Sequence, residues 1–119
     1  MANKGFAHVE IPTDNRADSA KFYSTVFGWE MTPLDDMDYT TFSSGNVGGG
    51  FPKVDGNVSK KDRVLIYVDS DDIDADLKKV EAAGGKTLHG KEEIPGWGWW
   101  AMFSDPTGNS LGLYQKLPK

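Results

Sequence analysis

The sequence has no cysteine and only two histidines among its 119 residues. The absence of cysteine excludes disulfides, thiol catalysis and cysteine-ligated zinc or iron–sulfur centres. Positive charge is also in short supply, because 13 Lys and Arg stand against 18 Asp and Glu, giving a net charge of −5. This balance argues against a nucleic-acid-binding protein, which needs a basic footprint for the phosphate backbone.

Long hydrophobic runs are absent as well. No apolar stretch approaches the roughly 18 residues of a membrane span, and Met1–Phe6 is too short and polar for a signal peptide. The length suits one domain. A chain of this size can bury about two thirds of its unfolded surface, which is enough for a core without disulfide or metal cross-links. We therefore expect a single cytoplasmic domain over residues 1–119, with neither a membrane nor a nucleic acid as partner.

The chain repeats itself weakly, and the repeat predicts its organisation. Ala7–Gly28 aligns with Val64–Gly85, and each copy reads as a strand, a polar turn, an amphipathic helix and a glycine. Three short strands are expected after each helix, so the order is βαβββ twice. The two modules span about 6–52 and 63–115, and the polar segment at about 53–62 is expected to link them.

The helix ends carry matching signals in the two copies. Asp14 and Asp71 suit the N-cap and first-turn positions of the helices, and Gly28 and Gly85 suit a left-handed exit. Helices are expected at 16–27 and 73–83. Strands are expected at about 7–11, 29–33, 39–43 and 47–52 in the first copy, and at about 64–68, 86–93, 99–104 and 110–115 in the second.

Three segments carry a resemblance to a known family. They read HVEIPTDN at 8–15, KFYSTVFGW at 21–29 and DPTGNSLGLYQ at 105–115. In this order they resemble the vicinal oxygen chelate superfamily, which includes glyoxalase I, extradiol dioxygenases and bleomycin-resistance proteins. The resemblance implies an α+β fold in which two βαβββ modules form a cup-shaped mixed sheet, and it implies a homodimer.

The same resemblance permits a test for a metal centre. Metal-dependent members of the family place a His or Glu at each of four cup positions, two in each module. Those positions are occupied here by His8, Gly49, Leu65 and Gly112, and the second histidine, His89, has no matching partner. One ligand of four does not hold a catalytic divalent ion. The sequence therefore predicts no metal and no other cofactor.

Period-two alternation predicts which side chains line the cup. His8 and Glu10 share a face and form its polar anchors, with His8 as an acid, a base or a donor tuned by Glu10. A strand-face hydrogen bond without chemistry is the alternative for this pair. The expected ligand-binding walls are Phe51, Tyr67, Trp100, Met102 and Tyr114.

Tryptophan is concentrated in one expected hairpin. Three of the four tryptophans lie in Gly96–Trp100, where Pro and Gly favour a turn. Solvent exposure of all three would be costly. They are expected to pack on the sheet or at the dimer interface, or to form a rim over the cup.

An aromatic concavity with few polar groups is typical of a small-molecule pocket. We therefore expect a metal-free, glyoxalase/bleomycin-resistance-like protein that binds a small organic molecule, with no reaction defined. As an enzyme it would be a lyase or oxidoreductase of this superfamily. One alternative is a metal-dependent glyoxalase-type lyase or dioxygenase, which the ligand count disfavours. The other is a drug-sequestering resistance protein in which aromatic rings stack on a planar cation, although alternation maps no acidic cluster to the cup.

Overall fold

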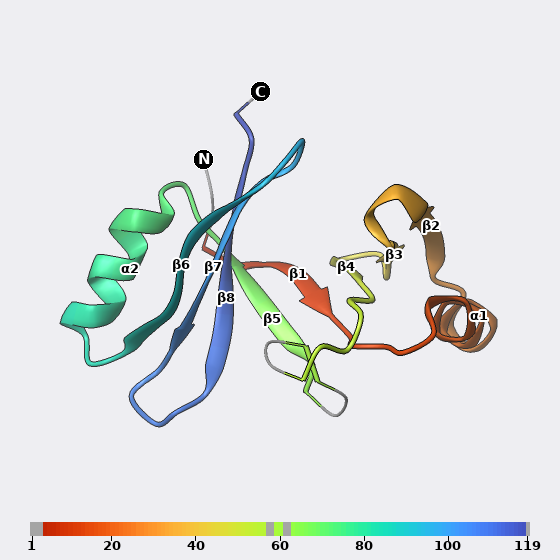
Figure 1. The fold of residues 1–119 in the computed structure, drawn as a ribbon, viewed down its shortest axis with the longest axis horizontal. Coiled ribbons are helices and arrows are strands. Elements are labelled where there is room, and N and C mark those ends of the chain that lie inside the picture. The colour runs from red at the N-terminus through yellow and green to blue at the C-terminus, as the bar shows by residue number, and fades with distance from the viewer. Residues whose placement is uncertain (1–3, 57–58, 61–62, 119) are drawn as a thin grey trace. The chain divides into compact units, whose positions relative to one another are not determined.

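The computed structural model describes residues 4–56, 59–60 and 63–118 (Figure 1). Over these residues the chain forms two α-helices and eight strands, which confirms the α+β class. It divides into two compact units, His8–Leu65 and the combination of Met1–Ala7 with Ile66–Lys119. The division falls close to the boundaries of the sequence repeat, although the start of the first strand belongs to the second unit and Leu65 belongs to the first. Each unit is described by itself below.

The first unit contains one helix and a mixed sheet in the strand order β2-β3-β4-β1. Its elements are β1 (Phe6–Glu10), α1 (Arg16–Phe27), β2 (Glu30–Leu34), β3 (Tyr39–Ser43) and β4 (Gly48–Gly50), with a short 3₁₀ helix at Asp35–Met37 that the sequence did not predict. β1 runs parallel to β4, and the other pairs are antiparallel.

The ends of α1 follow from its capping residues. The side chain of Asn15 accepts a hydrogen bond from the backbone N–H of Asp18 at 3.1 Å, so the N-cap is Asn15 and not the predicted Asp14. Gly28 closes the helix in the left-handed conformation at φ 73°, as expected.

The core of the first unit is a cluster of aromatic rings. Phe51 is fully buried, and its ring lies 5.7 Å from Tyr23 of α1 and 5.2 Å from Phe42 of β3. Trp29 extends the cluster, with its ring centroid 4.8 Å from that of Phe42. The prediction that Phe51 lines the cup with His8 is therefore wrong, because Phe51 packs against the helix.

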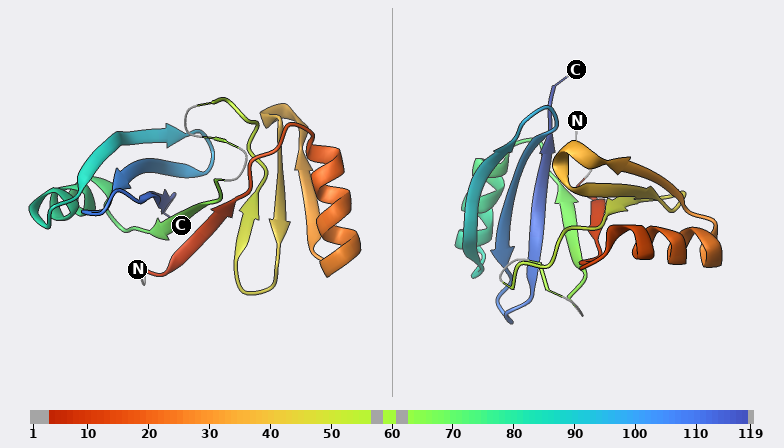
Figure 2. Two further views of the ribbon diagram at one scale, coloured as in Figure 1. Left: turned by 90° about the horizontal axis from the view of Figure 1, so that it is seen from below. Right: turned by 45° about the vertical axis from the view of Figure 1, so that its right-hand side comes forward.

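The second unit repeats the arrangement with strand order β5-β8-β7-β6. Its elements are β5 (Leu65–Asp69), α2 (Ile73–Ala82), β6 (Lys86–Ile94), β7 (Gly98–Ser104) and β8 (Ser110–Lys116). α2 lies along one face of this sheet (Figure 2). The buried core between helix and sheet consists of Ile73, Leu77, Ala101 and Leu113, against which Val68, Trp99 and Phe103 pack.

Two details of the α2 ends differ from the prediction by one residue. The N-cap is Asp72, which accepts from the N–H of Ala75 at 3.2 Å, and not Asp71. The positive φ beyond the helix belongs to Gly84, at 98°, and not to Gly85. A Cβ on Gly85 would instead approach the Ser104 carbonyl and the Val80 side chain, so Gly85 permits a close backbone approach.

The expected hairpin joins β6 to β7. The Trp97 N–H donates to the Ile94 carbonyl at 2.9 Å, and Gly96 has φ 84°. Pro and Gly at the two central positions are typical of a type II turn. The tryptophans then diverge: Trp97 is 45% exposed, Trp99 packs toward α2, and Trp100 lies on the opposite face.

The segment that was expected to link the modules is only partly described. Residues 57–58 and 61–62 lie outside the described residues. Lys53 forms an isolated parallel bridge with Thr13. Over the described parts of the chain, no helix is long and apolar enough to cross a membrane.

Candidate functional site

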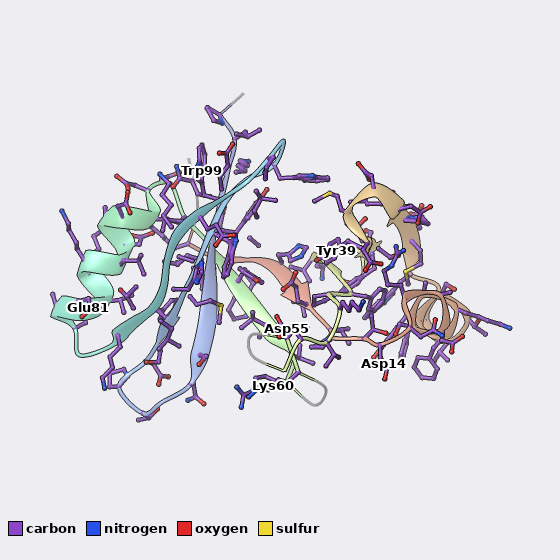
Figure 3. All side chains as sticks on the ribbon, in the orientation of Figure 1. Asp14, Tyr39, Asp55, Lys60, Glu81 and Trp99 are labelled. Carbon is purple, nitrogen blue, oxygen red and sulfur yellow. The ribbon has the colours of Figure 1, made fainter. Side chains whose placement is uncertain are left out.

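A hydrogen-bonded triad lies on the sheet of the first unit. His8 and Glu10 project from the same face of β1, as alternation predicts. The His8 Nε2 atom lies 2.8 Å from the Tyr39 hydroxyl, which donates to Glu10 Oε2, also at 2.8 Å. His8 Nε2 and Glu10 Oε2 are themselves 3.8 Å apart. Tyr39, labelled in Figure 3, therefore joins the two predicted anchors.

The protonation of the triad follows from its hydrogen bonds and its burial. Because the single hydroxyl proton of Tyr39 goes to Glu10, the His8 ring donates its Nε2–H to the Tyr39 oxygen. Burial lowers the pKa of His8 from 6.5 to about 4, since the charged imidazolium loses its hydration. His8 is therefore neutral at physiological pH.

Tyr39 takes up the space beside Glu10 that a further ligand would need. Glu10 pairs with Gly50 of β4, and a Cβ on Gly50 would overlap the Tyr39 ring. Sequence reasoning missed Tyr39, although alternation along the predicted strand 39–43 would have placed it on this face. The contact was not foreseeable without the β3–β4–β1 pairing that carries Tyr39 to His8.

The second unit has the same relation between a glycine and a tyrosine. Tyr67 of β5 pairs with Gly112 of β8, and a Cβ on Gly112 would overlap the Tyr67 ring. Since Glu10 and Tyr67 are equivalent in the sequence repeat, the counterpart of Gly112 is Gly50 and not the predicted Gly49. Gly49 belongs to the opposite face, where a Cβ would meet the Phe42 ring.

These residues do not fit the metal centre of the metal-dependent family members. Two of the four positions are glycines covered by tyrosine rings, and Leu65 is a buried hydrocarbon, which leaves His8 as the single donor. Within the described ranges, no three His, Asp or Glu side chains are grouped so as to hold a metal ion.

The second unit brings four of the predicted wall residues together on the sheet face opposite α2, which we call the aromatic face. Its residues form two cross-strand rows. One row is His89–Met102–Gly112–Tyr67, and the other is Glu92–Trp100–Tyr114–Asp69, in the strand order β6-β7-β8-β5. Met102 and Tyr67 are buried, whereas Trp100 and Tyr114 are half-buried.

An irregularity in β6 brings His89 to the aromatic face. The register between β6 and β7 shifts between Thr87 and His89 and again between His89 and Glu92. Such bulges re-aim side chains. As a result, the His89 ring stacks on Trp100 with centroids 4.2 Å apart and planes 4° apart, and His89 Nε2 lies 2.7 Å from Glu92 Oε1.

Tyr114 occupies the middle of the Trp100 row. Its hydroxyl donates to the Trp97 carbonyl at 3.1 Å, which ties the aromatic face to the hairpin turn. Burial raises the pKa of Tyr114, and the negative charge of Asp69 raises it further. The phenol is therefore a neutral hydroxyl at physiological pH, and the Asp69 carboxylate acts on it electrostatically.

A family-model match over most of the chain identifies the family. The model of the Glyoxalase/Bleomycin resistance protein/Dioxygenase superfamily matches residues 5–113. The chain belongs to this superfamily, which confirms the resemblance drawn from its three sequence segments.

Three known proteins illustrate the relationship. The anthracycline biosynthesis protein DnrV of Streptomyces peucetius is 29% identical over 92% of this chain, but the chain spans only 46% of DnrV. An uncharacterized protein of Mycolicibacterium smegmatis is 30% identical over the full length of both chains. The crystal structure of the hypothetical protein BH1468 from Bacillus halodurans has a TM-score of 0.74, covering 96% of this chain and 95% of that one, at 13% identity. The last likeness shows the fold alone.

Proposed function

We propose that the protein binds a small organic molecule on the aromatic face of its second unit. The observation that carries this proposal is the sharing of one sheet face by Tyr67, Trp100, Met102 and Tyr114, while α2 packs on the other face. Aromatic surface with a few fixed polar groups is what small-molecule sites use. Trp100 and Tyr114 remain partly exposed, so a ligand can reach them.

The orientation of Trp100 indicates where a flat ligand would stack. His89 reaches it from β6 and covers one face of the indole. On the other side, the direct cross-strand neighbour of Trp100 is Tyr114 of β8. A planar ring lying across this pair would contact two aromatic side chains at once.

The His8–Tyr39–Glu10 triad of the first unit is better suited to hydrogen bonding than to proton transfer. A histidine with a pKa of about 4 is almost wholly unprotonated at neutral pH, so His8 is not a general acid there. The triad instead offers neutral hydrogen-bonding groups beside the Glu10 carboxylate. A metal-dependent lyase or dioxygenase reaction is not supported, because the donor set does not fit a divalent ion.

The relatives are compatible with a small organic ligand. DnrV is named for anthracycline biosynthesis. Because the chain spans less than half of DnrV, the likeness supports a link to small-molecule chemistry and identifies neither a ligand nor a reaction.

The proposal is tested with 4-methylquinoline, a flat neutral probe at mildly alkaline pH. Wild type is compared with Trp100→Ala and with the matched control Trp97→Ala, whose side chain is 45% exposed at the hairpin tip. Losing a well-packed aromatic contact should weaken binding about 5- to 150-fold, corresponding to about 1–3 kcal/mol. Trp97→Ala should bind as wild type does. Equal binding by wild type and Trp100→Ala would overturn the proposal.

A further inference from the structure

We infer that the ligand of the aromatic face is a planar aromatic cation. This inference rests on the proposed function and adds the charge of the ligand to it. The row Glu92–Trp100–Tyr114–Asp69 crosses all four strands of the second unit, with a carboxylate at each end and two aromatic rings between them. At about 4.8 Å between neighbouring strands, the row extends about 14 Å.

Each carboxylate is fixed next to an aromatic ring by independent evidence. Glu92 is the cross-strand partner of Trp100, and its Oε1 is held 2.7 Å from the Nε2 of His89, whose ring stacks on that same indole. Asp69 is the cross-strand partner of Tyr114, and its charge raises the pKa of that phenol. The two acids therefore lie at opposite ends of the pair on which a flat ring would stack.

This arrangement selects a cation for two physical reasons. The π faces of Trp and Tyr attract positive charge through their quadrupoles, most strongly for Trp. The two carboxylates add Coulomb attraction and would repel a carboxylate or phosphate ligand. The register places the lysines of this face, Lys86 and Lys116, at strand ends and outside the two rows. The net charge of −5 of the whole chain also favours a cationic ligand over an anionic one.

Alternation places both acids on this face. Asp69 follows Tyr67 by two residues in β5, and Glu92 shares the face of Lys86 because the two register shifts in β6 offset each other. Glu93, the next residue, pairs with Trp99, whose side chain packs toward α2. Neighbouring glutamates thus occupy opposite faces of one strand, which provides a matched control for the role of Glu92.

The experiment compares two probes of nearly equal shape, N-methylquinolinium, a permanent cation, and 4-methylquinoline, which is neutral at mildly alkaline pH. Binding to the full chain is measured by NMR titration at low salt. The cation should bind wild type about 5- to 30-fold more tightly than the neutral probe, the combined scale of a cation–π contact and partly exposed charge pairs.

Two variants then locate the source of the selectivity. Glu92→Gln keeps an acceptor for His89 and removes the charge, so it should weaken binding of the cation about 2- to 5-fold more than it weakens binding of the neutral probe. Adding Asp69→Asn should reduce the preference further, whereas Glu93→Gln should leave it intact.

The failures of the two proposals are distinguishable. If both probes bind wild type equally, or if Glu92→Gln and Glu93→Gln have the same effect, the cation inference is wrong and the aromatic binding face stands. If neither probe binds in a manner that depends on Trp100, the proposed function itself fails.

Discussion

Acid should destabilise the protein through His8, and the size of the effect follows from its environment. The imidazole is 29% exposed and has a pKa of about 4, against 6.5 when it is hydrated. At about 1.4 kcal/mol for each pH unit, this difference is worth up to about 3 kcal/mol of folding free energy. The Glu10 carboxylate, 3.8 Å away, favours the charged ring, so this figure is an upper limit.

The sign of the effect is set by which state binds the proton first. As the pH falls below about 6.5, the unfolded chain protonates His8 while the folded protein does not, so stability present at neutral pH is lost progressively down to about pH 4. Urea unfolding across this range should therefore show a steeper loss for wild type than for His8→Gln. Other groups titrate in both proteins, and their contributions cancel in the difference. Parallel stability curves, or His8 ring signals that titrate near 6.5 in NMR, would show that burial does not lower the pKa of His8.

Three further predictions concern packing and assembly. Phe103→Ala removes a ring packed on the α2 core and should lower the free energy of unfolding by about 2–4 kcal/mol in thermal melts. Trp100→Ala should lower it less. The reverse order would mean that the side chains of β7 are assigned to the wrong faces of the sheet. Gly112→Ala should cost about 1–3 kcal/mol in urea unfolding, because the new Cβ overlaps the Tyr67 ring, and a variant as stable as wild type would contradict that contact. The family resemblance predicts a homodimer, so sedimentation at micromolar concentration should show a species of twice the 13.1 kDa chain mass, and a clean monomer would count against it.

The fold was largely predictable because the sequence repeat is reinforced by local signals. The helix at Arg16–Phe27 and the strand at Tyr39–Ser43 agree with the prediction residue for residue. Capping side chains, a glycine exit and alternating apolar residues all indicate the same elements. The same alternation correctly placed Trp100 and Met102 on one face of the sheet, and Ala101 and Phe103 on the other.

The facing of β4 could not be read from the sequence. Gly48–Gly50 carries no side chains, so its pattern shows neither a buried nor an exposed face, and counting from Val47 put Phe51 on the wrong side. The strand order settles the matter, since Gly48 and Gly50 pair with His8 and Glu10.

The polar chemistry was the least predictable part of the candidate sites. Tyr39 reaches His8 only through strands that pair across the first sheet, and the sequence separation of 31 residues gave no hint of the contact. His89 faces Trp100 because β6 is irregular between Thr87 and His89, and alternation along an ideal strand does not foresee a bulge.

Binding of a small molecule on the aromatic face can be followed through the four tryptophan indole N–H signals in an ¹⁵N-labelled sample titrated with 4-methylquinoline. These signals report on different places: Trp29 in the aromatic core of the first unit, Trp97 at the hairpin tip, Trp99 toward α2 and Trp100 on the aromatic face. We expect a saturable shift of the Trp100 signal while the signals of Trp29 and Trp99 stay in place. A saturable shift of Trp29 or Trp99 with Trp100 unmoved would contradict binding on the aromatic face.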